Sequence, residues 1–107
     1  MKLIGTGSAL PSKIVTNDDI AQFLDTSDEW IFPRTGIRSR HVISDEKIED
    51  LGAEAARKAL DMAGLNASDI DLFICPNVVT EYMTPGLSSV ISHILGLTCP
   101  SIDINCA

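Results

Sequence analysis

The order of apolar segments in the second half of this sequence is the feature that most constrains its fold. Residues 45–63 carry apolar side chains three and four positions apart, which predicts a helix. Residues 70–75 form a near-continuous apolar run, which is typical of a strand covered on both faces. A second helical stripe over residues 84–96 and a second strand over residues 101–106 follow. This alternation predicts an α/β fold with a mostly parallel sheet and covering helices.

Turn and capping residues give the boundaries of these elements. Gly64 stands where a C-terminal glycine of a helix belongs. Thr84 and Pro85 combine an N-cap residue with a proline at the first helical position, so the second helix is expected to begin there. Pro76 is expected to end the strand over residues 70–75, because proline cannot donate to a strand ladder.

The first half of the chain carries weaker signals. Residues 2–8 predict a short first strand. Thr16 or Asn17 is expected to cap a helix over residues 18–24, whose first turn is acidic, as the helix dipole favours. Residues 25–41 are rich in charged and turn-forming residues, but they include large apolar side chains that need burial. We therefore expect an ordered loop with short elements there.

Composition limits both the architecture and the partners. A chain of 107 residues supports one domain at most. Its 45% hydrophobic and 21% charged residues predict a globular protein. The formal charge of −7 argues against nucleic acid as a partner, because contact with phosphates needs an excess of Lys and Arg. The N-terminal segment predicts neither a signal peptide nor a membrane span.

The cysteines and histidines do not suggest a metal site. Cys75, Cys99 and Cys106 show neither a CxxC spacing nor a Cys/His ladder. We expect no bound metal, and we expect reduced thiols in a cytoplasmic protein. His93 lies beside serines on the polar side of its helix, which is typical of a surface histidine.

Three stretches of the chain resemble one family. They are GTGSALP at residues 5–11, DTSDEWI at residues 25–31 with RTGIR at residues 34–38, and DINCA at residues 103–107. In order and spacing they are similar to the N-terminal portion of ketoacyl-ACP synthase III, one of the thiolase-fold condensing enzymes. The second stretch is the most specific of the three. The resemblance spans the whole chain, which corresponds to the opening third of a family member.

The resemblance implies both a fold and a reaction. The fold is part of the N-terminal half of a thiolase-like fold. The reaction is a decarboxylative Claisen condensation, in which a cysteine takes an acyl group from an acyl-CoA such as acetyl-CoA, and malonyl-acyl carrier protein then decarboxylates and attacks the thioester. The resemblance further implies a cytoplasmic homodimer that uses acyl-CoA as a substrate, without a prosthetic group.

The register of the third stretch places the expected nucleophile outside the chain. In the family the cysteine follows the aspartate by five positions, so counting from Asp103 leads to the residue after Ala107. Cys106 is therefore interpreted as a buried strand thiol, and His41 does not match the family's histidine. We expect residues 1–107 to form a single incomplete thiolase-like domain, truncated just before the nucleophile, with no catalytic residue and no activity by itself.

The second stretch supplies the candidate binding residues. The resemblance implies that Trp30 and Arg34 hold the adenine of coenzyme A between an indole face and a guanidinium plane. It also implies that Thr26 forms a hydrogen bond near the same nucleotide. Stacking of a base on an aromatic side chain contributes about 1–3 kcal/mol, and a flat guanidinium stacks as well. Without the resemblance, Trp30 is interpreted as a large half-buried residue whose N–H finds a partner.

Other polar and small residues have structural as well as functional interpretations. Arg38 and Arg40 either face the phosphates of coenzyme A or form a solvated charged surface. Gly5 and Gly7 indicate close backbone packing, because the third glycine of a dinucleotide-binding motif is missing. Asp103, in a buried strand, is interpreted as a structural hydrogen-bonding group.

Two alternatives to the leading function remain. A thiolase-fold acyltransferase of secondary metabolism would have the same acyl-CoA site in this segment. The chain by itself is alternatively a non-catalytic domain that binds coenzyme A or associates with itself. Strands that are covered on both faces in a whole enzyme are expected to expose apolar faces in this shorter chain, which favours self-association.

Overall fold

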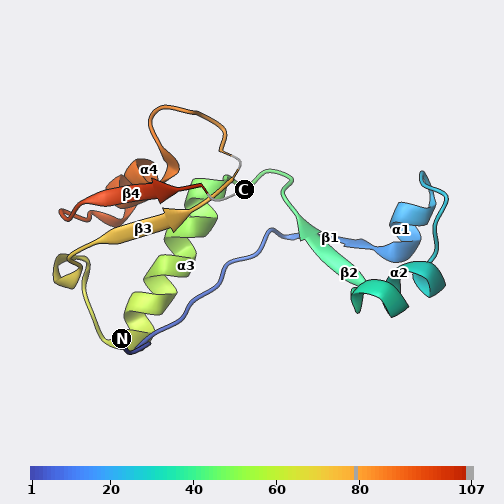
Figure 1. The fold of residues 1–107 in the computed structure, drawn as a ribbon, viewed down its shortest axis with the longest axis horizontal. Helices are drawn as coiled ribbons and strands as arrows, with labels where there is room; N and C mark the ends of the chain where they lie inside the picture. The colour runs from blue at the N-terminus through green and yellow to red at the C-terminus, as the bar shows by residue number, and fades with distance from the viewer. Residues whose placement is uncertain (79, 106–107) are drawn as a thin grey trace. The chain divides into compact units, whose positions relative to one another are not determined.

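The computed structural model describes residues 1–78 and 80–105 (Figure 1). The chain divides into two compact units, which are described here one at a time. The larger unit comprises Met1–Ala9 and Lys47–Ala107, and the smaller unit comprises Leu10–Glu46. The expectation of a single domain over residues 1–107 stays a prediction.

The larger unit contains a β-α-β arrangement. Strand β3 (Phe73–Pro76) pairs in parallel with strand β4 (Ser101–Ile104), and helix α4 (Leu87–Leu95) lies between them in the chain. Helix α3 (Ile48–Ala63) packs against α4, and a short 3-10 helix (Ala67–Asp69) precedes β3. The α/β class and the parallel pairing predicted from the sequence are confirmed.

The predicted ends of α3 and β3, at Gly64 and Pro76, are confirmed, whereas their predicted starts at residues 45 and 70 lie three residues before the observed ones. Gly64 closes α3 with a φ of 70°, a left-handed conformation that favours glycine. Strand β3 begins at Phe73 rather than at Ile70, and it includes Pro76. Pro76 adds no donor to the ladder, and the next bond to β4 comes from the amide of Asn77.

The predicted start of α4 at Thr84 is wrong by two residues. Gly86 is the N-cap, and glycine has no side chain that could accept a capping hydrogen bond. The carboxylate of Asp103, in β4, takes this role. Asp103 accepts hydrogen bonds from the backbone nitrogen of Ser88 at 3.0 Å and from its hydroxyl at 2.7 Å. A Cβ at position 86 would collide with the same carboxylate, so the cap and the glycine depend on each other.

The predicted strand over residues 2–8 is also wrong, because these residues lie in no helix or strand. The segment instead lies against α3. A Cβ on Gly7 would overlap the carbonyl oxygen of Ala55 and come within 2.6 Å of the amide nitrogen of Ala59. A Cβ on Gly5 would overlap the carbonyl oxygen of Ala59. These contacts confirm that both glycines permit close backbone packing.

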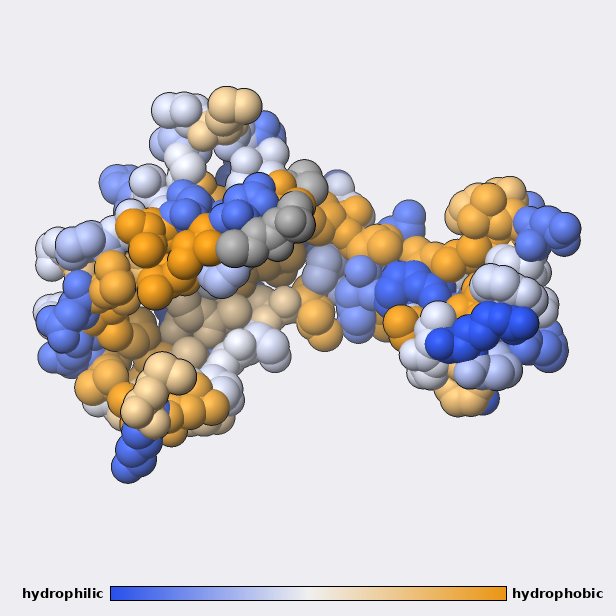
Figure 2. Space-filling model, in the orientation of Figure 1, coloured by the Kyte–Doolittle hydropathy of each residue, from blue (hydrophilic) through white to orange (hydrophobic). Residues whose placement is uncertain are grey.

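The helices cover one face of the β3–β4 pair and leave the other face exposed. The buried apolar residues of this unit are Ala53, Cys75, Leu87 and Ile91. Ile74 and Ile102, on the opposite face, remain 46% and 44% exposed. Apolar side chains accordingly reach the surface over these strands (Figure 2). This confirms the expectation that the chain exposes apolar strand faces.

The smaller unit is built on an antiparallel pair that the sequence did not predict. Strand β1 (Lys13–Thr16) pairs with strand β2 (Ser39–Val42), and helices α1 (Asn17–Ala21) and α2 (Asp28–Thr35) lie between them in the chain. The two described sheets are therefore one parallel pair and one antiparallel pair.

Helix α1 begins with a capping box. The Thr16 hydroxyl accepts a hydrogen bond from the amide of Asp19 at 3.1 Å, and the Asp19 carboxylate accepts from the amide of Thr16 at 2.8 Å. The bonds from the backbone and hydroxyl of Thr16 lower the pKa of Asp19. The predicted start of this helix is confirmed, but the helix ends at Ala21 and does not reach Leu24.

Candidate functional site

Helix α2 positions two of the three candidate binding residues, Trp30 and Arg34. It begins after Ser27, whose hydroxyl accepts a hydrogen bond from the amide of Trp30 at 3.2 Å, and it ends at Gly36 with a φ of 70°. The sequence predicted short elements here but no specific helix, because Pro33 lies within it. The Ser27 cap and the acidic first turn are signals that would have predicted it.

Trp30 and Arg34 lie four positions apart and contact each other directly. The Cζ atom of Arg34 lies 4.4 Å from the centroid of the indole, which is a cation–π contact. Nη1 of Arg34 also donates to the carbonyl oxygen of Trp30 at 2.8 Å. Trp30 as a whole nevertheless remains 55% exposed, so the residue is accessible to a ligand.

Thr26 and Trp30 border the same hollow of about 410 Å³, in the smaller unit. The residues that line it are Ile20, Leu24, Asp25, Thr26, Trp30 and Ile31. The hydroxyl of Thr26 is buried, and it has no hydrogen-bond partner among the described residues. Buried polar groups are almost always paired, so an unpaired hydroxyl at this position is unusual and retains unused hydrogen-bonding capacity.

The structure therefore brings Thr26, Trp30 and Arg34 together in one place. Two of them line the hollow, and the third contacts the indole. The guanidinium of Arg34 lies directly on the ring, where the sequence interpretation expected a nucleotide base. A base can stack between the two groups only after the guanidinium moves away.

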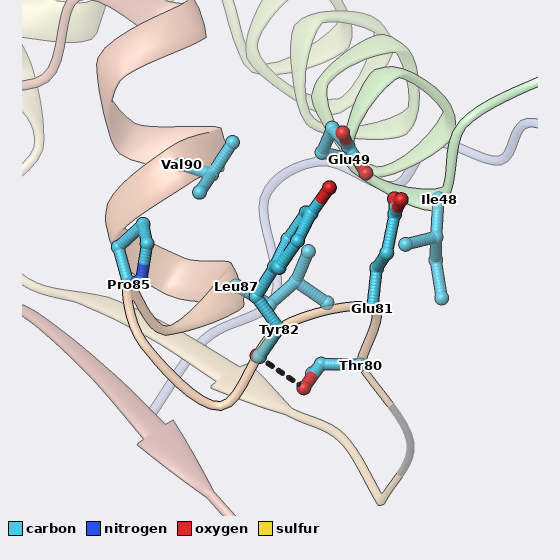
Figure 3. Close-up of a pocket in the computed structure, with 8 residues that line it drawn as sticks. All are labelled: Ile48, Glu49, Thr80, Glu81, Tyr82, Pro85, Leu87 and Val90. Carbon is cyan, nitrogen blue, oxygen red and sulfur yellow. Dashed lines mark hydrogen bonds between the residues drawn. The ribbon is translucent and has the colours of Figure 1, made fainter.

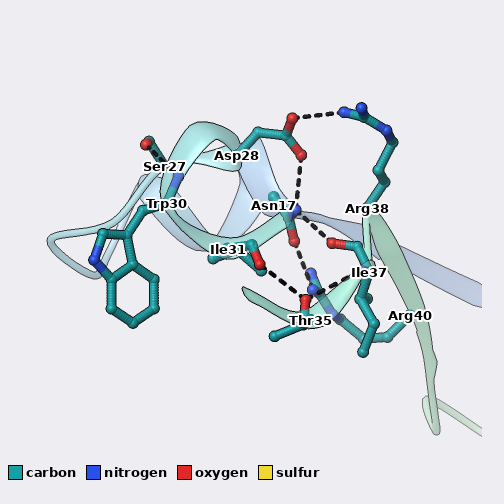
Figure 4. A network of polar contacts seen from close by, with 9 residues as sticks. All are labelled: Asn17, Ser27, Asp28, Trp30, Ile31, Thr35, Ile37, Arg38 and Arg40. Carbon is teal, nitrogen blue, oxygen red and sulfur yellow. Dashed lines mark hydrogen bonds and ion pairs between the residues drawn. The ribbon is translucent and has the colours of Figure 1, made fainter. Parts of the chain in front are cut away.

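A buried asparagine that sequence reasoning named only as a helix cap connects the elements of this unit (Figure 4). Asn17 is 1% exposed. Its Nδ2 donates to Oδ1 of Asp28 and to the carbonyl oxygen of Ile37, both at 2.8 Å. Its Oδ1 accepts a hydrogen bond from Nη2 of Arg40 at 2.6 Å. Asn17 thus joins the start of α1 to α2 and to β2, through contacts that no local sequence pattern indicates.

Arg38 and Arg40 are engaged within the smaller unit. Nη1 of Arg38 donates to Oδ2 of Asp28 at 2.6 Å, and its Cζ atom lies 3.7 Å from the centroid of Phe32. Arg40 binds Asn17 and also donates to the carbonyl oxygen of Val15 at 3.2 Å. These contacts favour a structural role over phosphate binding for both arginines.

The carboxyl ends of β3 and β4 carry a second polar cluster, in the larger unit. Asp103 accepts a hydrogen bond from Nδ2 of Asn77 at 2.7 Å, in addition to those from Ser88. Desolvation raises the pKa of Asp103, but the hydrogen bonds from Ser88 and Asn77 outweigh it, so that the pKa is lowered. Asp103 is therefore a structural hydrogen-bonding group, as predicted. Cys106 lies outside the described residues.

The buried thiol of Cys75 fits a structural role. Desolvation raises its pKa and outweighs a hydrogen bond from Asn77 that lowers it, and the nearby carboxylate of Asp103 adds a smaller increase. A thiol with a raised pKa holds little thiolate at neutral pH, so Cys75 is a poor nucleophile.

A very small hollow of about 20 Å³ lies where the loop before α4 meets the start of α3 (Figure 3). Tyr82 extends from this loop toward Glu49 and Glu81, and its carbonyl oxygen accepts a hydrogen bond from the hydroxyl of Thr80 at 2.7 Å. The space is about that of one water molecule, too small for an acyl group.

Two further properties of the described residues bear on possible partners. None of their helices has the length and apolar character needed to cross a membrane. Their His, Cys, Asp and Glu side chains form no group of three or more that could hold a metal ion.

Relatives of known function resemble the chain closely over nearly all of its length. No protein-family profile matches the sequence. The beta-ketoacyl-[acyl-carrier-protein] synthase III of Neisseria meningitidis is 50% identical over 106 residues, which are 96% of this chain and 33% of that protein. The chain thus spans about a third of the length of the curated relatives that it matches.

Solved structures show the same relationship. The 3-oxoacyl-[acyl-carrier-protein] synthase III of Aquifex aeolicus VF5 matches with a TM-score of 0.94 and 36% identity, over 99% of this chain and 35% of that chain. The priming beta-ketosynthase of the R1128 polyketide biosynthetic pathway matches with a TM-score of 0.92 and 36% identity, over 98% of this chain and 32% of that chain.

The fold of the chain is therefore that of part of a thiolase-fold condensing enzyme. Sequence identity shows which enzyme within this class the chain resembles. The chain is a homologue of β-ketoacyl-[acyl-carrier-protein] synthase III over about a third of that enzyme, and the resemblance predicted from the sequence is confirmed.

Proposed function

We propose that the protein carrying this chain is a ketoacyl-ACP synthase III, an acyltransferase that condenses an acyl-CoA with malonyl-acyl carrier protein to start fatty-acid synthesis. One structural observation supports the proposal in addition to homology. Thr26, Trp30 and Arg34, which match the family's coenzyme A residues, gather beside one hollow. The proposal includes a cytoplasmic homodimer that binds acyl carrier protein through residues outside this chain.

In this proposal, the contribution of the chain is to bind the nucleotide of acyl-CoA. A base that stacks between the indole and the guanidinium needs about 7 Å between them, because each contact takes about 3.5 Å. The present separation between Arg34 and Trp30 is 4.4 Å, so the guanidinium must move outward. The exposed cation–π contact that is lost costs about 0.5–1 kcal/mol, whereas base stacking contributes about 1–3 kcal/mol. The hydrogen bond from Arg34 to the carbonyl oxygen of Trp30 is lost as well, at a net cost of about 0.5–1.5 kcal/mol. The stacking energy of a base is therefore similar in size to the contacts that it replaces.

Thr26 would fix the orientation of the stacked base. Its hydroxyl both donates and accepts, so it can pair with either kind of edge group on the base. The pairing also removes a buried group without a partner, which otherwise costs about 1–3 kcal/mol. Holding the nucleotide end in this way would leave the thioester end of acyl-CoA to the residues that perform the condensation.

Kinetics of the intact protein test this assignment. With acetyl-CoA and malonyl-acyl carrier protein as substrates, Trp30→Ala is expected to raise the KM for acetyl-CoA about tenfold, which corresponds to about 1.4 kcal/mol of lost stacking. The kcat should change little, because the nucleotide is bound equally in the ground state and the transition state. Trp30→Phe, which keeps an aromatic face, should retain most of the affinity. A KM unaffected by Trp30→Ala would remove Trp30 from the site.

A second candidate function is favoured by the match to the priming ketosynthase of a polyketide pathway. Such an enzyme would use the same nucleotide site but a different acyl group. Comparing the rates at which the intact protein consumes acetyl-CoA and longer or branched acyl-CoA esters separates the two candidates. Preference for acetyl-CoA or another fatty-acid starter supports the leading proposal. Binding of coenzyme A without any condensation would support a non-catalytic domain.

Cys106 offers a separate test of the predicted register. After incubation of the chain with acetyl-CoA, we expect peptide mass spectrometry to show no acetyl group on Cys106. The physical reason is that the nucleophile is expected two positions further along. The thiol of Cys99 serves as a control for non-specific acylation in the same digest. An acetyl group on Cys106 but not on Cys99 would show that the register is wrong.

A further inference from the structure

The two faces of helix α2 make different contacts. Asp28 and Phe32 lie four positions apart on one face, and both contact Arg38, the residue directly before β2. Trp30 and Arg34 also lie four positions apart, about 200° around the helix from the first pair. Figure 4 shows the indole on the side of the helix away from Arg38. One face thus anchors the helix, and the other presents the candidate binding residues.

Three side chains hold the anchoring face, and we name them the α2 clamp: Asn17, Asp28 and Arg38. Both carboxylate oxygens of Asp28 are used, one by Nδ2 of Asn17 at 2.8 Å and the other by Nη1 of Arg38 at 2.6 Å. Arg38 lies at the same time over the ring of Phe32, with Cζ 3.7 Å from the centroid. Position 28 is the first residue of α2, so the clamp fixes both the start and the rotation of the helix.

The contribution of the Asp28–Arg38 ion pair to stability is expected to be small. The side chains of Arg38 and Asp28 are 62% and 31% exposed, and pairs of this kind contribute about 0–1 kcal/mol. Orientation is therefore the larger effect of this pair. A rotation of α2 by one residue would move the indole by about 100° around the helix axis and away from the hollow.

We infer that the α2 clamp positions the nucleotide site, by holding α2 so that Trp30 borders the hollow and Arg34 can close over its ring. This inference rests on the proposed binding of acyl-CoA. It assigns to Arg38 a role in nucleotide binding that acts through the helix and not through contact with phosphate. Asp28, Asn17 and Arg38 are positioning residues in this scheme, since none of them lines the hollow.

Asp28→Asn is the sharpest test variant. In the amide, one of the two carboxylate oxygens becomes an NH2 group, which donates and cannot accept, so either Asn17 or Arg38 then faces another donor in the present geometry. The matched control is Glu29→Gln, which removes the same charge from the same first turn at an exposed neighbouring position. Both changes alter the interaction with the helix dipole equally. Arg38→Met provides a second test variant, because it removes the ion pair while keeping an apolar side chain over Phe32.

The measurement is the Kd of coenzyme A by calorimetry, for the intact protein with and without Trp30→Ala. Asp28→Asn and Arg38→Met are each expected to weaken binding about fivefold when Trp30 is present, which corresponds to about 1 kcal/mol. They should have a much smaller effect in the Trp30→Ala background, because the helix then has no indole to position and only Arg34 remains. Glu29→Gln should leave the Kd unchanged in both backgrounds.

Each outcome separates this inference from the proposed function. If Trp30→Ala alone leaves the Kd unchanged, the proposed nucleotide site is wrong. If Trp30→Ala weakens binding but the clamp variants do not, the site stands and the positioning role is wrong. Clamp variants that weaken binding equally in both backgrounds would also overturn the positioning role, because that result indicates a general loss of structure.

Discussion

Replacing Asn17 with alanine is expected to lower the free energy of unfolding by about 3 kcal/mol. The side chain is 1% exposed and bonds to α2 and β2 through Asp28, Ile37 and Arg40. Alanine would leave the carbonyl oxygen of Ile37 and the guanidinium of Arg40 without these bonds, at a position that water reaches poorly. Removing one partner from such a network costs more than the net worth of its hydrogen bonds.

Urea unfolding of the intact protein measures this loss, and Asn105→Ala is the matched control. Asn105 is exposed, so the same chemical change there should alter the free energy of unfolding by no more than about 0.5 kcal/mol. A loss below about 1 kcal/mol for Asn17→Ala would mean that water replaces the lost hydrogen bonds. That result would contradict the role of Asn17 as the connection between α1, α2 and β2.

The second large effect is expected from Gly7→Val, which should also lower the free energy of unfolding by about 3 kcal/mol. A Cβ at this position would overlap the carbonyl oxygen of Ala55 and lie 2.6 Å from the amide nitrogen of Ala59. Both are backbone atoms of α3, and they cannot rotate away as a side chain can. The N-terminal segment would therefore have to separate from the helix.

Ser8→Val is the matched control for this substitution, because it introduces the same side chain at the next, exposed position. It should shift the urea midpoint only slightly, whereas Gly7→Val should shift it strongly. Equal midpoints for the two variants would show that residues 5–7 do not need close contact with α3. The interpretation of both glycines as packing residues would then be wrong.

The elements that the sequence predicted well are those defined by local patterns. Helix α3 has its apolar residues three and four positions apart and ends at Gly64, and both signals lie within the helix or directly after it. The capping box of Thr16 and Asp19 is equally local. These signals were sufficient because intrinsic helix geometry and capping depend on residues close in sequence.

The predictions that failed depend on distant residues. Residues 2–8 have the composition of a strand, but a strand needs a neighbour for its hydrogen-bond ladder, and this segment contacts α3 instead. Paired residues of strands β1 and β2 are 23 to 29 positions apart in sequence, as Thr16 with Ser39 and Lys13 with Val42. The N-terminus of α4 depends on Asp103, which is 15 positions from Ser88.

In the candidate site, too, some features follow from local sequence and others depend on distant residues. Trp30, Arg34 and Thr26 were identified through the family resemblance, whereas the residues alone favoured a half-buried tryptophan. The structure brings the three together, and the cation–π contact between Trp30 and Arg34 follows from their helical spacing. The α2 clamp was not predictable, since Asn17 and Arg38 meet only through the pairing of β1 with β2.

The position of Trp30 has a practical consequence. It is the only tryptophan among the 107 residues, so the tryptophan fluorescence of this chain comes from a single indole beside the hollow. A guanidinium 4.4 Å from that ring is close enough to affect its emission. Withdrawal of Arg34 and insertion of a base would each change the colour or intensity of the emitted light, which allows ligand entry to be followed in real time without an attached dye.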